Sequence, residues 1–395
     1  MKDDKLKILA IIPTGFCFGL QHITVSFFSR FPGYIESHFL LTRWTTGDME
    51  KLLKEKNIPY SFSWLGMFSR KMDWTNIKMS LHALITLPKL YIDFIALQKK
   101  NKPDILYFAN HHELILLYPL LLFTKRVVVC HIHDPSPVIP FQQKAFKWYD
   151  KVVDNYIAIS ENVRQRTIAL GCKPEKIQTI HNGIIIPPKR ESGRANDFCD
   201  KAAWPQNVFI IGITGQMIEK KGHMDLIEAF KKVYDKNPLA RLVIGGKKQE
   251  PLYTMLREKI SAWKMEKLVY FPGWLPDINF FFKNIDLFVL ASRHEEGYGL
   301  VVAEAMANKL PVVITESGGA VEIIENYNSG FIVPKADPVS MAVRLYKLSE
   351  DARMCIKTGE SARERIEQYF DIQKQVIKIA AHLAALKNTG IVRKK

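Results

Sequence analysis

The chain has 395 residues, 47% of them hydrophobic and 24% charged, and its formal net charge is +16 at pH 7. This length exceeds what one ordinary hydrophobic core fills, so we expect two domains, and the composition excludes a disordered or fibrous chain. No run of consecutive apolar residues reaches the roughly 18 to 20 of a membrane-spanning helix. The five cysteines are scattered without a CxxC spacing, which predicts neither a disulfide framework nor a zinc site and favours a cytoplasmic protein.

The positive charge lies mainly in the first half of the chain, where residues 1–190 hold 26 Lys and Arg against 15 Asp and Glu. A basic surface suits nucleic acid, an anionic membrane or a phosphorylated substrate, and the sequence contains no motif that favours nucleic acid. Residues 63–102 interleave basic with aromatic and aliphatic residues at near-helical spacing. This pattern is typical of a helix on a membrane surface, and equally of a helix that covers a sheet and turns a basic face to solvent. The sequence leaves both interpretations open.

Short apolar runs alternate with helical patterns along the chain, which predicts parallel sheets covered by helices on both faces. The expected strands are residues 6–12, 37–41, 104–109, 126–133, 155–160, 177–182, 208–215, 240–246, 268–273, 286–291, 310–315 and 330–333. The fold class is therefore predicted as α/β, with two Rossmann-like doubly wound domains and a cleft between the carboxyl ends of their strands.

The segment 186–207 is rich in proline, charge and small residues, which predicts a linker. It separates an N-terminal domain, residues 1–185, from a C-terminal domain, residues 208–360. The remaining residues, 361–395, carry a long helical pattern that we expect to pack back on the N-terminal domain.

In the first half, two loops after strands carry candidate binding residues. Gly19 follows the first strand, where a glycine lets the backbone approach a phosphate or sugar, although an ordinary strand–helix turn looks the same. His131 and His133 end the strand 126–133 and should point to one face, unless one of them only makes local hydrogen bonds. No third ligand lies at metal-binding spacing, so no metal site is expected. His111 and His112 end another strand and are interpreted as polar loop residues.

In the second half, Lys221 and Gly222 open an amphipathic helix directly after a strand and a turn. An ammonium group beside free helix amides is a cradle for a diphosphate, although a lysine at a helix start is often only solvated.

The stretch 292–324 places Glu296 on a loop and Glu304 in a predicted helix, with seven residues between them. The helix is expected to begin near Leu300, which leaves the first-turn amides free and places Glu304 one turn in. This geometry suits one extended ligand that has hydroxyl groups at both ends and a diphosphate between them.

The stretch "EGYGLVVAE" (296–304) resembles the glutamate–seven–glutamate motif of retaining glycosyltransferases of group 1, family 4, which have the GT-B fold. Surrounding blocks resemble the same family in the expected order: "AISENVRQRTIALGCKPEKIQTIHNGI", "YFPGWLPDINFFFKNIDLFVLAS", "LPVVITESGGAVEII" and "SGFIVP". The resemblance is close over residues 150–335 and holds in outline over residues 1–149.

The resemblance implies a role for each matching residue. Glu304 would hold the ribose hydroxyls, Glu296 the hydroxyls of the donor sugar, and Lys221 would lie beside the diphosphate. The backbone amides that would bind the diphosphate are those around Tyr298, Gly299 and Leu300. His133 would lie next to the transferred sugar, so the catalytic residues implied are His133, Lys221 and Glu296.

Three positions depart from the family pattern. Gln216 stands where an arginine is common, which removes one cation from the diphosphate site. Lys309 stands where a glycine is common, and the usual Gly-Gly of the N-terminal loop is Phe18-Gly19. We also place Gly19 and Gln216 among the donor-binding residues.

The resemblance implies a retaining, metal-independent hexosyltransferase that uses a UDP- or GDP-sugar and no cofactor, in bacterial surface polysaccharide or glycolipid assembly. Its partners would be the donor, a carbohydrate or lipid-linked acceptor and an anionic membrane at the inner face of the cell, without nucleic acid. Two alternatives remain open: a non-catalytic nucleotide-sugar-binding subunit, and a sugar-nucleotide epimerase on the same scaffold.

Overall fold

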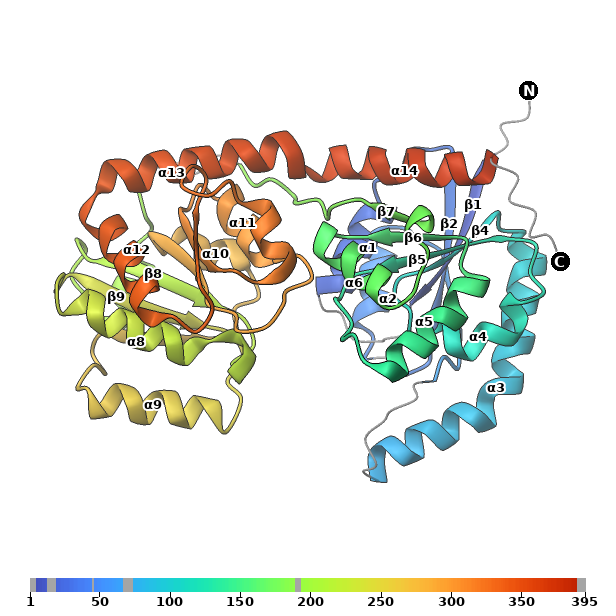
Figure 1. The fold of residues 1–395 in the computed structure, drawn as a ribbon, viewed down its shortest axis with the longest axis horizontal. Helices are drawn as coiled ribbons and strands as arrows, with labels where there is room; N and C mark the ends of the chain where they lie inside the picture. The colour runs from blue at the N-terminus through green and yellow to red at the C-terminus, as the bar shows by residue number, and fades with distance from the viewer. Residues whose placement is uncertain (1–4, 13–18, 45, 67–73, 189–192, 389–395) are drawn as a thin grey trace. The chain divides into compact units, whose positions relative to one another are not determined.

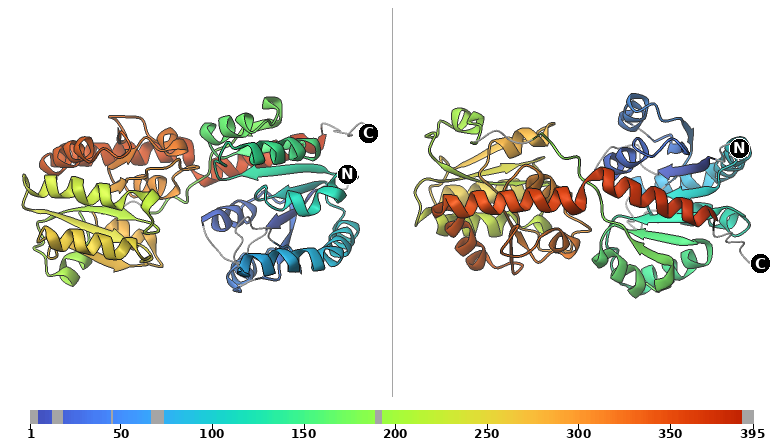
Figure 2. Two further views of the ribbon diagram at one scale, coloured as in Figure 1. Left: turned by 60° about the horizontal axis from the view of Figure 1, so that its bottom comes forward. Right: turned by 90° about the horizontal axis from the view of Figure 1, so that it is seen from above.

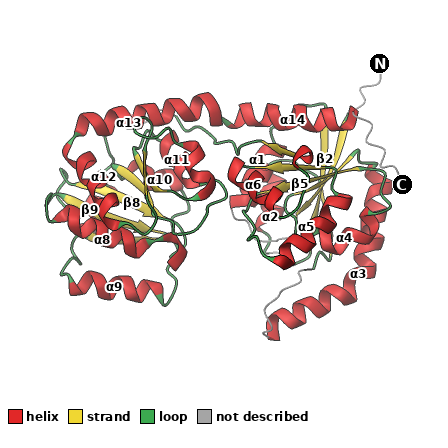
Figure 3. Cartoon of the chain, viewed as in Figure 1, coloured by secondary structure: helices red, strands yellow, loops and turns green. Residues whose placement is uncertain are grey.

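The computed structural model describes residues 5–12, 19–44, 46–66, 74–188 and 193–388. The chain divides into two compact units, of which the first comprises residues 1–183 and 372–395 and the second residues 184–371. Each unit contains one parallel sheet with helices on both faces (Figures 1 and 3). The α/β prediction of two doubly wound domains is therefore confirmed.

The first unit contains a seven-stranded sheet in the order β3-β2-β1-β4-β5-β6-β7. Its strands are β1 (Leu6–Ile12), β2 (Ile35–Thr42), β3 (Tyr60–Ser63), β4 (Ile105–Phe108), β5 (Val127–Ile132), β6 (Asn155–Ala158) and β7 (Ile177–Thr179). Its α-helices are α1 (Gly19–Phe28), α2 (Asp48–Glu55), α3 (Trp74–Asn101), α4 (Leu114–Leu121), α5 (Pro140–Val152), α6 (Glu161–Ala169) and α14 (Ile372–Asn388), and η1 (Pro174–Lys176) is a 3-10 turn.

The faces of this sheet are covered by different helices. The chain steps outward from β1 to β3 and then returns to β4, so right-handed crossovers place α1 and α2 on one face and α3 to α6 on the other. α14 shares the face of α1 and α2, because its apolar residues belong to the same buried cluster. It lies against the first unit in both views of Figure 2.

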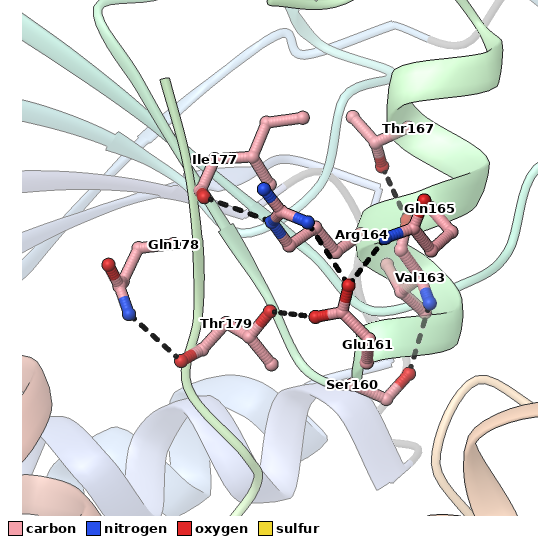
Figure 4. Close-up of polar contacts among 9 residues, drawn as sticks. All are labelled: Ser160, Glu161, Val163, Arg164, Gln165, Thr167, Ile177, Gln178 and Thr179. Atoms are coloured by element: carbon pink, nitrogen blue, oxygen red, sulfur yellow. Dashed lines mark hydrogen bonds and ion pairs between the residues drawn. The ribbon is translucent and has the colours of Figure 1, made fainter. Parts of the chain in front are cut away.

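The start of α6 shows how one of the family-like blocks folds (Figure 4). The Ser160 hydroxyl caps the helix by accepting a hydrogen bond from the Val163 amide at 3.1 Å. The Glu161 carboxylate accepts hydrogen bonds from Arg164 and Gln165 within the helix and from the Thr179 hydroxyl of β7 at 3.1 Å. These contacts fix α6 to the edge strand that follows it.

The second unit contains a six-stranded sheet in the order β10-β9-β8-β11-β12-β13. Its strands are β8 (Phe209–Thr214), β9 (Ala240–Gly245), β10 (Val269–Gly273), β11 (Leu287–Leu290), β12 (Val312–Thr315) and β13 (Phe331–Val333). Its α-helices are α7 (Asp197–Ala202), α8 (His223–Tyr234), α9 (Leu252–Ala262), α10 (Ile278–Lys283), α11 (Leu300–Ala307), α12 (Pro338–Glu350) and α13 (Ala352–Arg365). Its short turns are η2 (Glu219–Lys221), η3 (Gly318–Ile323) and the π-helical η4 (Ile366–Phe370).

The boundaries differ from the expected ones in two places. The segment expected as a linker, 186–207, lies in the second unit and contains α7, whose Phe198 and Cys199 are fully buried. The C-terminal helical pattern breaks at η4, so α13 belongs to the second unit and α14 to the first. Buried apolar side chains, which a linker would not contain, explain the first difference.

Candidate functional site

In the second unit, two of the predicted site residues meet at one edge of the sheet. β8 and β11 are parallel neighbours, so the loops that follow them emerge at the same end, where doubly wound sheets bind ligands. Lys221 follows β8 and Glu296 follows β11. The Lys221 ammonium lies 2.6 Å from the Glu296 carboxylate, and both side chains are largely buried.

Gly222 makes this close approach feasible. It adopts a left-handed φ of 68° at the start of α8, and a Cβ atom at this position would lie 1.9 Å from the Ala291 carbonyl oxygen. Only glycine fits both the dihedral angle and the space. The start of α8 therefore packs directly against the end of β11.

Three residues that the sequence did not indicate hold the loop after β11 in place. The buried Ser292 hydroxyl donates a hydrogen bond to the Glu296 oxygen that Lys221 contacts. The Arg293 guanidinium binds the buried Asp225 of α8 through two hydrogen bonds of 2.7 and 2.5 Å, and this contact raises the pKa of Arg293. The partners lie 68 residues apart in the chain, so no local sequence signal could have paired them.

The turn between the two glutamates leads into α11. Gly299 precedes the helix with φ 92°, and no side chain caps this helix start in the described chain. The Val302 amide donates to the Gly299 carbonyl oxygen at 2.9 Å, so the first-turn amides before it are the ones available to an anion. The Gly319 amide donates to the Glu296 carbonyl oxygen at 2.9 Å, which fixes the turn to η3.

The Tyr298 side chain takes no part in this anion-binding arrangement. It is buried, and its ring packs edge-on against Phe370 with 6.3 Å between centroids. Burial raises the pKa of its phenol well above the ordinary value. The predicted contribution of Tyr298 to donor binding stays a prediction about its backbone amide.

Glu304 differs from Glu296 in its surroundings. It lies in α11, and no hydrogen bond or ion pair engages its carboxylate among the described residues. Desolvation raises its pKa to about 7. A partly buried carboxyl group without a partner is ready to bind a polar ligand.

Two departures from the family pattern have a structural setting. Gln216 is exposed in the loop after β8, so its side chain can reach a ligand at this edge. Lys309 adopts a positive φ of 59° after α11, which explains why a glycine is common there.

The first unit contains the other predicted residues, Gly19 and His133. Gly19 begins α1, but most of the predicted loop, residues 13–18, lies outside the described residues, so its role stays a prediction. His133 follows β5 and is buried, with its ring 4.1 Å from that of His131. The two histidines thus lie on one side of the strand, as predicted.

The two histidines differ in their hydrogen bonds. His131 binds the buried Tyr107 hydroxyl through Nδ1, which is the local role that the sequence left open. The Nε2 atom of His133 is buried and unpartnered among the described residues. Desolvation lowers the pKa of His133 to about 3, so its ring is neutral at physiological pH and can only donate or accept a hydrogen bond.

His111 lies in the loop between β4 and α4, as interpreted, but it is not a surface residue. Its ring is buried, 4.9 Å from that of Phe146, and neither ring nitrogen has a described partner. Desolvation lowers the pKa of His111 to about 3 and raises that of nearby Glu113 to about 8. At neutral pH this end of β4 therefore carries uncharged groups.

Family models match two segments of the chain, which together exceed half of its length. Residues 196–365 match the model described as glycosyl transferases group 1, and residues 77–186 match the one described as glycosyltransferase family 4.

Two curated relatives are named as biosynthetic glycosyltransferases. The capsular polysaccharide biosynthesis glycosyltransferase CapM of Staphylococcus aureus is 28% identical over 223 residues, which cover 55% of this chain and 58% of CapM. The amylovoran biosynthesis glycosyltransferase AmsK of Erwinia amylovora is 29% identical over 238 residues, which cover 58% and 56%. The chain thus matches little more than half the length of these relatives.

Solved structures share the fold over nearly the whole chain. Alr3699/HepE of Anabaena, in complex with UDP, superposes with a TM-score of 0.81 at 21% identity, covering 96% of this chain and 100% of that one. A glycosyltransferase from Rickettsia africae superposes with a TM-score of 0.79 at 21% identity, covering 98% and 99%. The predicted GT-B fold is confirmed.

Proposed function

The chain belongs to glycosyltransferase family 4 (group 1), and on that premise we propose that it transfers a hexose-type sugar from a nucleoside diphosphate sugar to an acceptor hydroxyl, with retention at the anomeric carbon. One observation carries the proposal: the Lys221 ammonium contacts Glu296, and the loop that carries Glu296 leads into the uncapped start of α11, with the unpartnered Glu304 one turn further on.

Each of these groups suits one part of the donor. A diphosphate needs cations and amide donors, which Lys221 and the first turn of α11 supply. A ribose offers neighbouring hydroxyls as donors to the free carboxylate of Glu304, and the sugar hydroxyls would bind Glu296. Lys221 already neutralises Glu296, so the incoming diphosphate would share that ammonium.

In the proposed reaction, the bond between the anomeric carbon and the phosphate oxygen breaks and the acceptor oxygen bonds to the same face of the sugar. Positive charge develops on the sugar ring and negative charge on the leaving phosphate. Lys221 and the helix amides would stabilise the leaving group, which takes the proton from the acceptor hydroxyl. His133, held neutral by its surroundings, would lie next to the transferred sugar and would not act as an acid.

The proposal includes neutralisation of the diphosphate without a divalent ion. The support is the positive groups at the site, together with a sequence that contains no Asp-x-Asp pair. Turnover should therefore persist in excess EDTA, and loss of turnover that Mg²⁺ or Mn²⁺ restores would overturn this part of the proposal.

The acceptor is proposed to be a growing surface polysaccharide or glycolipid. The support comes from the names of the relatives, which include capsular polysaccharide and amylovoran biosynthesis. A glycosyltransferase with such an acceptor would work in the cytoplasm, where nucleotide sugars are made, and at the membrane that carries the acceptor.

The test is a binding screen with UDP, GDP and ADP and their hexoses, followed by nucleotide release from the best donor. Lys221→Ala should lower the rate of release by about 100-fold, whereas Lys220→Ala, which changes the exposed neighbouring lysine, should leave it near the wild-type rate. Donor binding without release above background would favour a non-catalytic subunit, and a product of inverted anomeric configuration would exclude the retaining reaction.

A further inference from the structure

Helix α3 is apolar on two opposite faces. Ala83, Leu90, Phe94 and Leu97 are buried and face the rest of the first unit. At 100° per residue, the opposite face carries a row of exposed apolar side chains, namely Trp74, Leu81, Leu84, Ile85, Ile92 and Ile95. Monomeric soluble proteins rarely expose a continuous apolar surface of this kind.

The inner face of α3 is held by the protein over residues 83–97, whereas no described residue from Trp74 to His82 is buried. The Tyr91 hydroxyl donates to the Leu116 carbonyl of α4 at 3.0 Å, and the Ser63 hydroxyl of β3 donates to Asp93 at 2.8 Å. By length and composition, residues Ile77–Asn101 would suffice to cross a membrane. Because one face of residues 83–97 is held by the unit, this part of the helix can present only its other face to a lipid surface, lying parallel to it. Figure 1 shows α3 at the periphery of the first unit.

Positive charge surrounds this apolar row. Lys78 and Lys99 are exposed on the same side of α3, and Asp93 is paired with Lys89. At the C-terminal end of the helix, a hollow between α3 and the end of α4 is lined by Ile95, Gln98, Lys99, Lys102, Leu120, Phe123, Thr124, Lys125 and Arg126. These lining residues include four cations and no carboxylate.

We propose that this surface, the outward face of α3 together with the hollow at its end, docks on an anionic phospholipid bilayer. Ile85, Ile92 and Phe123, which are 77%, 64% and 76% exposed, enter the boundary between headgroups and acyl chains. The cations of the hollow bind lipid phosphates. Burial of the apolar face and attraction of the lysines to anionic lipids both favour binding, as they do for interfacial helices. This inference concerns binding alone and does not depend on the proposed transfer reaction.

A second copy of the chain fits this surface less well. A two-fold contact would enclose the cations of both copies in one interface, because such contacts use the same patch on both subunits. Unpaired lysines brought together in this way repel one another. The same cations favour an anionic bilayer.

The test is flotation of the full chain with vesicles of phosphatidylcholine that contain about 30% phosphatidylglycerol, compared with phosphatidylcholine alone. The double variant Ile85→Glu/Ile92→Glu should lose binding by about tenfold or more. Its matched control is Ile356→Glu/Ile377→Glu, which changes isoleucines that are 64% and 66% exposed on other helices and should bind as the wild type does. Circular dichroism melting curves establish that both variants are folded.

The cations are tested separately. Lys99→Ala/Lys125→Ala/Arg126→Ala should weaken binding to the anionic vesicles and reduce its dependence on salt, whereas Lys232→Ala/Lys357→Ala/Lys378→Ala should not. Equal binding to both vesicle types, or no binding at low salt, would overturn the proposal. So would a dimer in light scattering that Ile85→Glu/Ile92→Glu dissociates, since a second copy would then cover this face.

Discussion

Glu296 lies before the start of α11 and Glu304 lies within that helix. The two carboxyl groups differ in whether the protein compensates their charge. Glu296 accepts hydrogen bonds from Lys221 and Ser292, so its charge is compensated within the protein. Glu304 has no such partner among the described residues, and desolvation raises its pKa to about 7. An unpaired, desolvated acid lowers the stability of the folded protein, and such groups are typical of functional sites.

We predict that Glu304→Gln stabilises the free protein while it weakens donor binding. The folded-state pKa is raised above the unfolded value, so the stability of the wild type falls as the pH rises from about 4.5 through 7. Glutamine resembles the protonated acid and removes this loss, so the free energy of unfolding of the second unit should rise by about 2 kcal/mol at pH 8 and change little at pH 4. Denaturant titrations at the two pH values measure this difference.

The same variant should bind the nucleotide about tenfold or more weakly, because an ionised acceptor is replaced by a neutral one. Titration calorimetry with the best nucleotide from the screen measures this change. A variant that gains stability but binds the nucleotide as tightly as the wild type would show that Glu304 does not hold the ribose.

At the scale of elements, the turn from β8 to α8 positions Lys221. We predict that Gly222→Ala disrupts it, because the new methyl group would lie 1.9 Å from the Ala291 carbonyl oxygen in addition to the strained φ of 68°. The loss of stability should reach about 3 kcal/mol or more. Hydrogen exchange of the α8 amides and a thermal melt both report it.

Gly273→Ala is the matched control for this prediction. Gly273 also has a positive φ, 79°, but nothing lies within 4 Å of its Cβ position, so only the dihedral strain remains and the loss should be about 1 kcal/mol. If both variants lose the same free energy of unfolding, the positive φ alone, and not the contact between α8 and the end of β11, would explain the glycine at position 222.

Elements were easier to predict from the sequence than contacts. All twelve expected strands are present within a few residues of their predicted bounds, because buried parallel strands are nearly continuous apolar runs. The sequence missed β3, whose "YSFS" alternates polar residues at the edge of the sheet. The family resemblance assigned Lys221 and Glu296 to one donor but did not predict the ion pair between them, and periodicity does not reveal which loops of parallel strands meet.

Contacts between distant segments were the least predictable part of the site. Arg293 supports it by binding Asp225, 68 residues away in the chain, and no local pattern indicates that bond. The burial of His111 also depends on Phe146 of α5, about 35 positions away. The sequence shows a polar residue in a loop, and it does not show that a helix covers that loop.

At the scale of the whole molecule, the end of the chain completes the unit in which the chain begins. α14 contributes Ile372, Val376, Ile379 and Leu383 to the buried cluster that contains Leu6 and Ile8 of β1. His382 of the same helix hydrogen-bonds to Asn155 of β6 at 2.8 Å. The first unit is therefore not a continuous stretch of sequence, and its core includes side chains of α14.

We predict that Ile379→Ala destabilises the first unit by about 2 to 4 kcal/mol, because the side chain is 1% exposed and its removal leaves a cavity. Ile377→Ala, on the same helix but 66% exposed, should change the free energy of unfolding by less than about 0.5 kcal/mol. Hydrogen exchange measured separately over β1 and over β8 resolves the two units. The protection of β1 should fall in Ile379→Ala while that of β8 is retained, and equal loss in both strands would show that the two units unfold together.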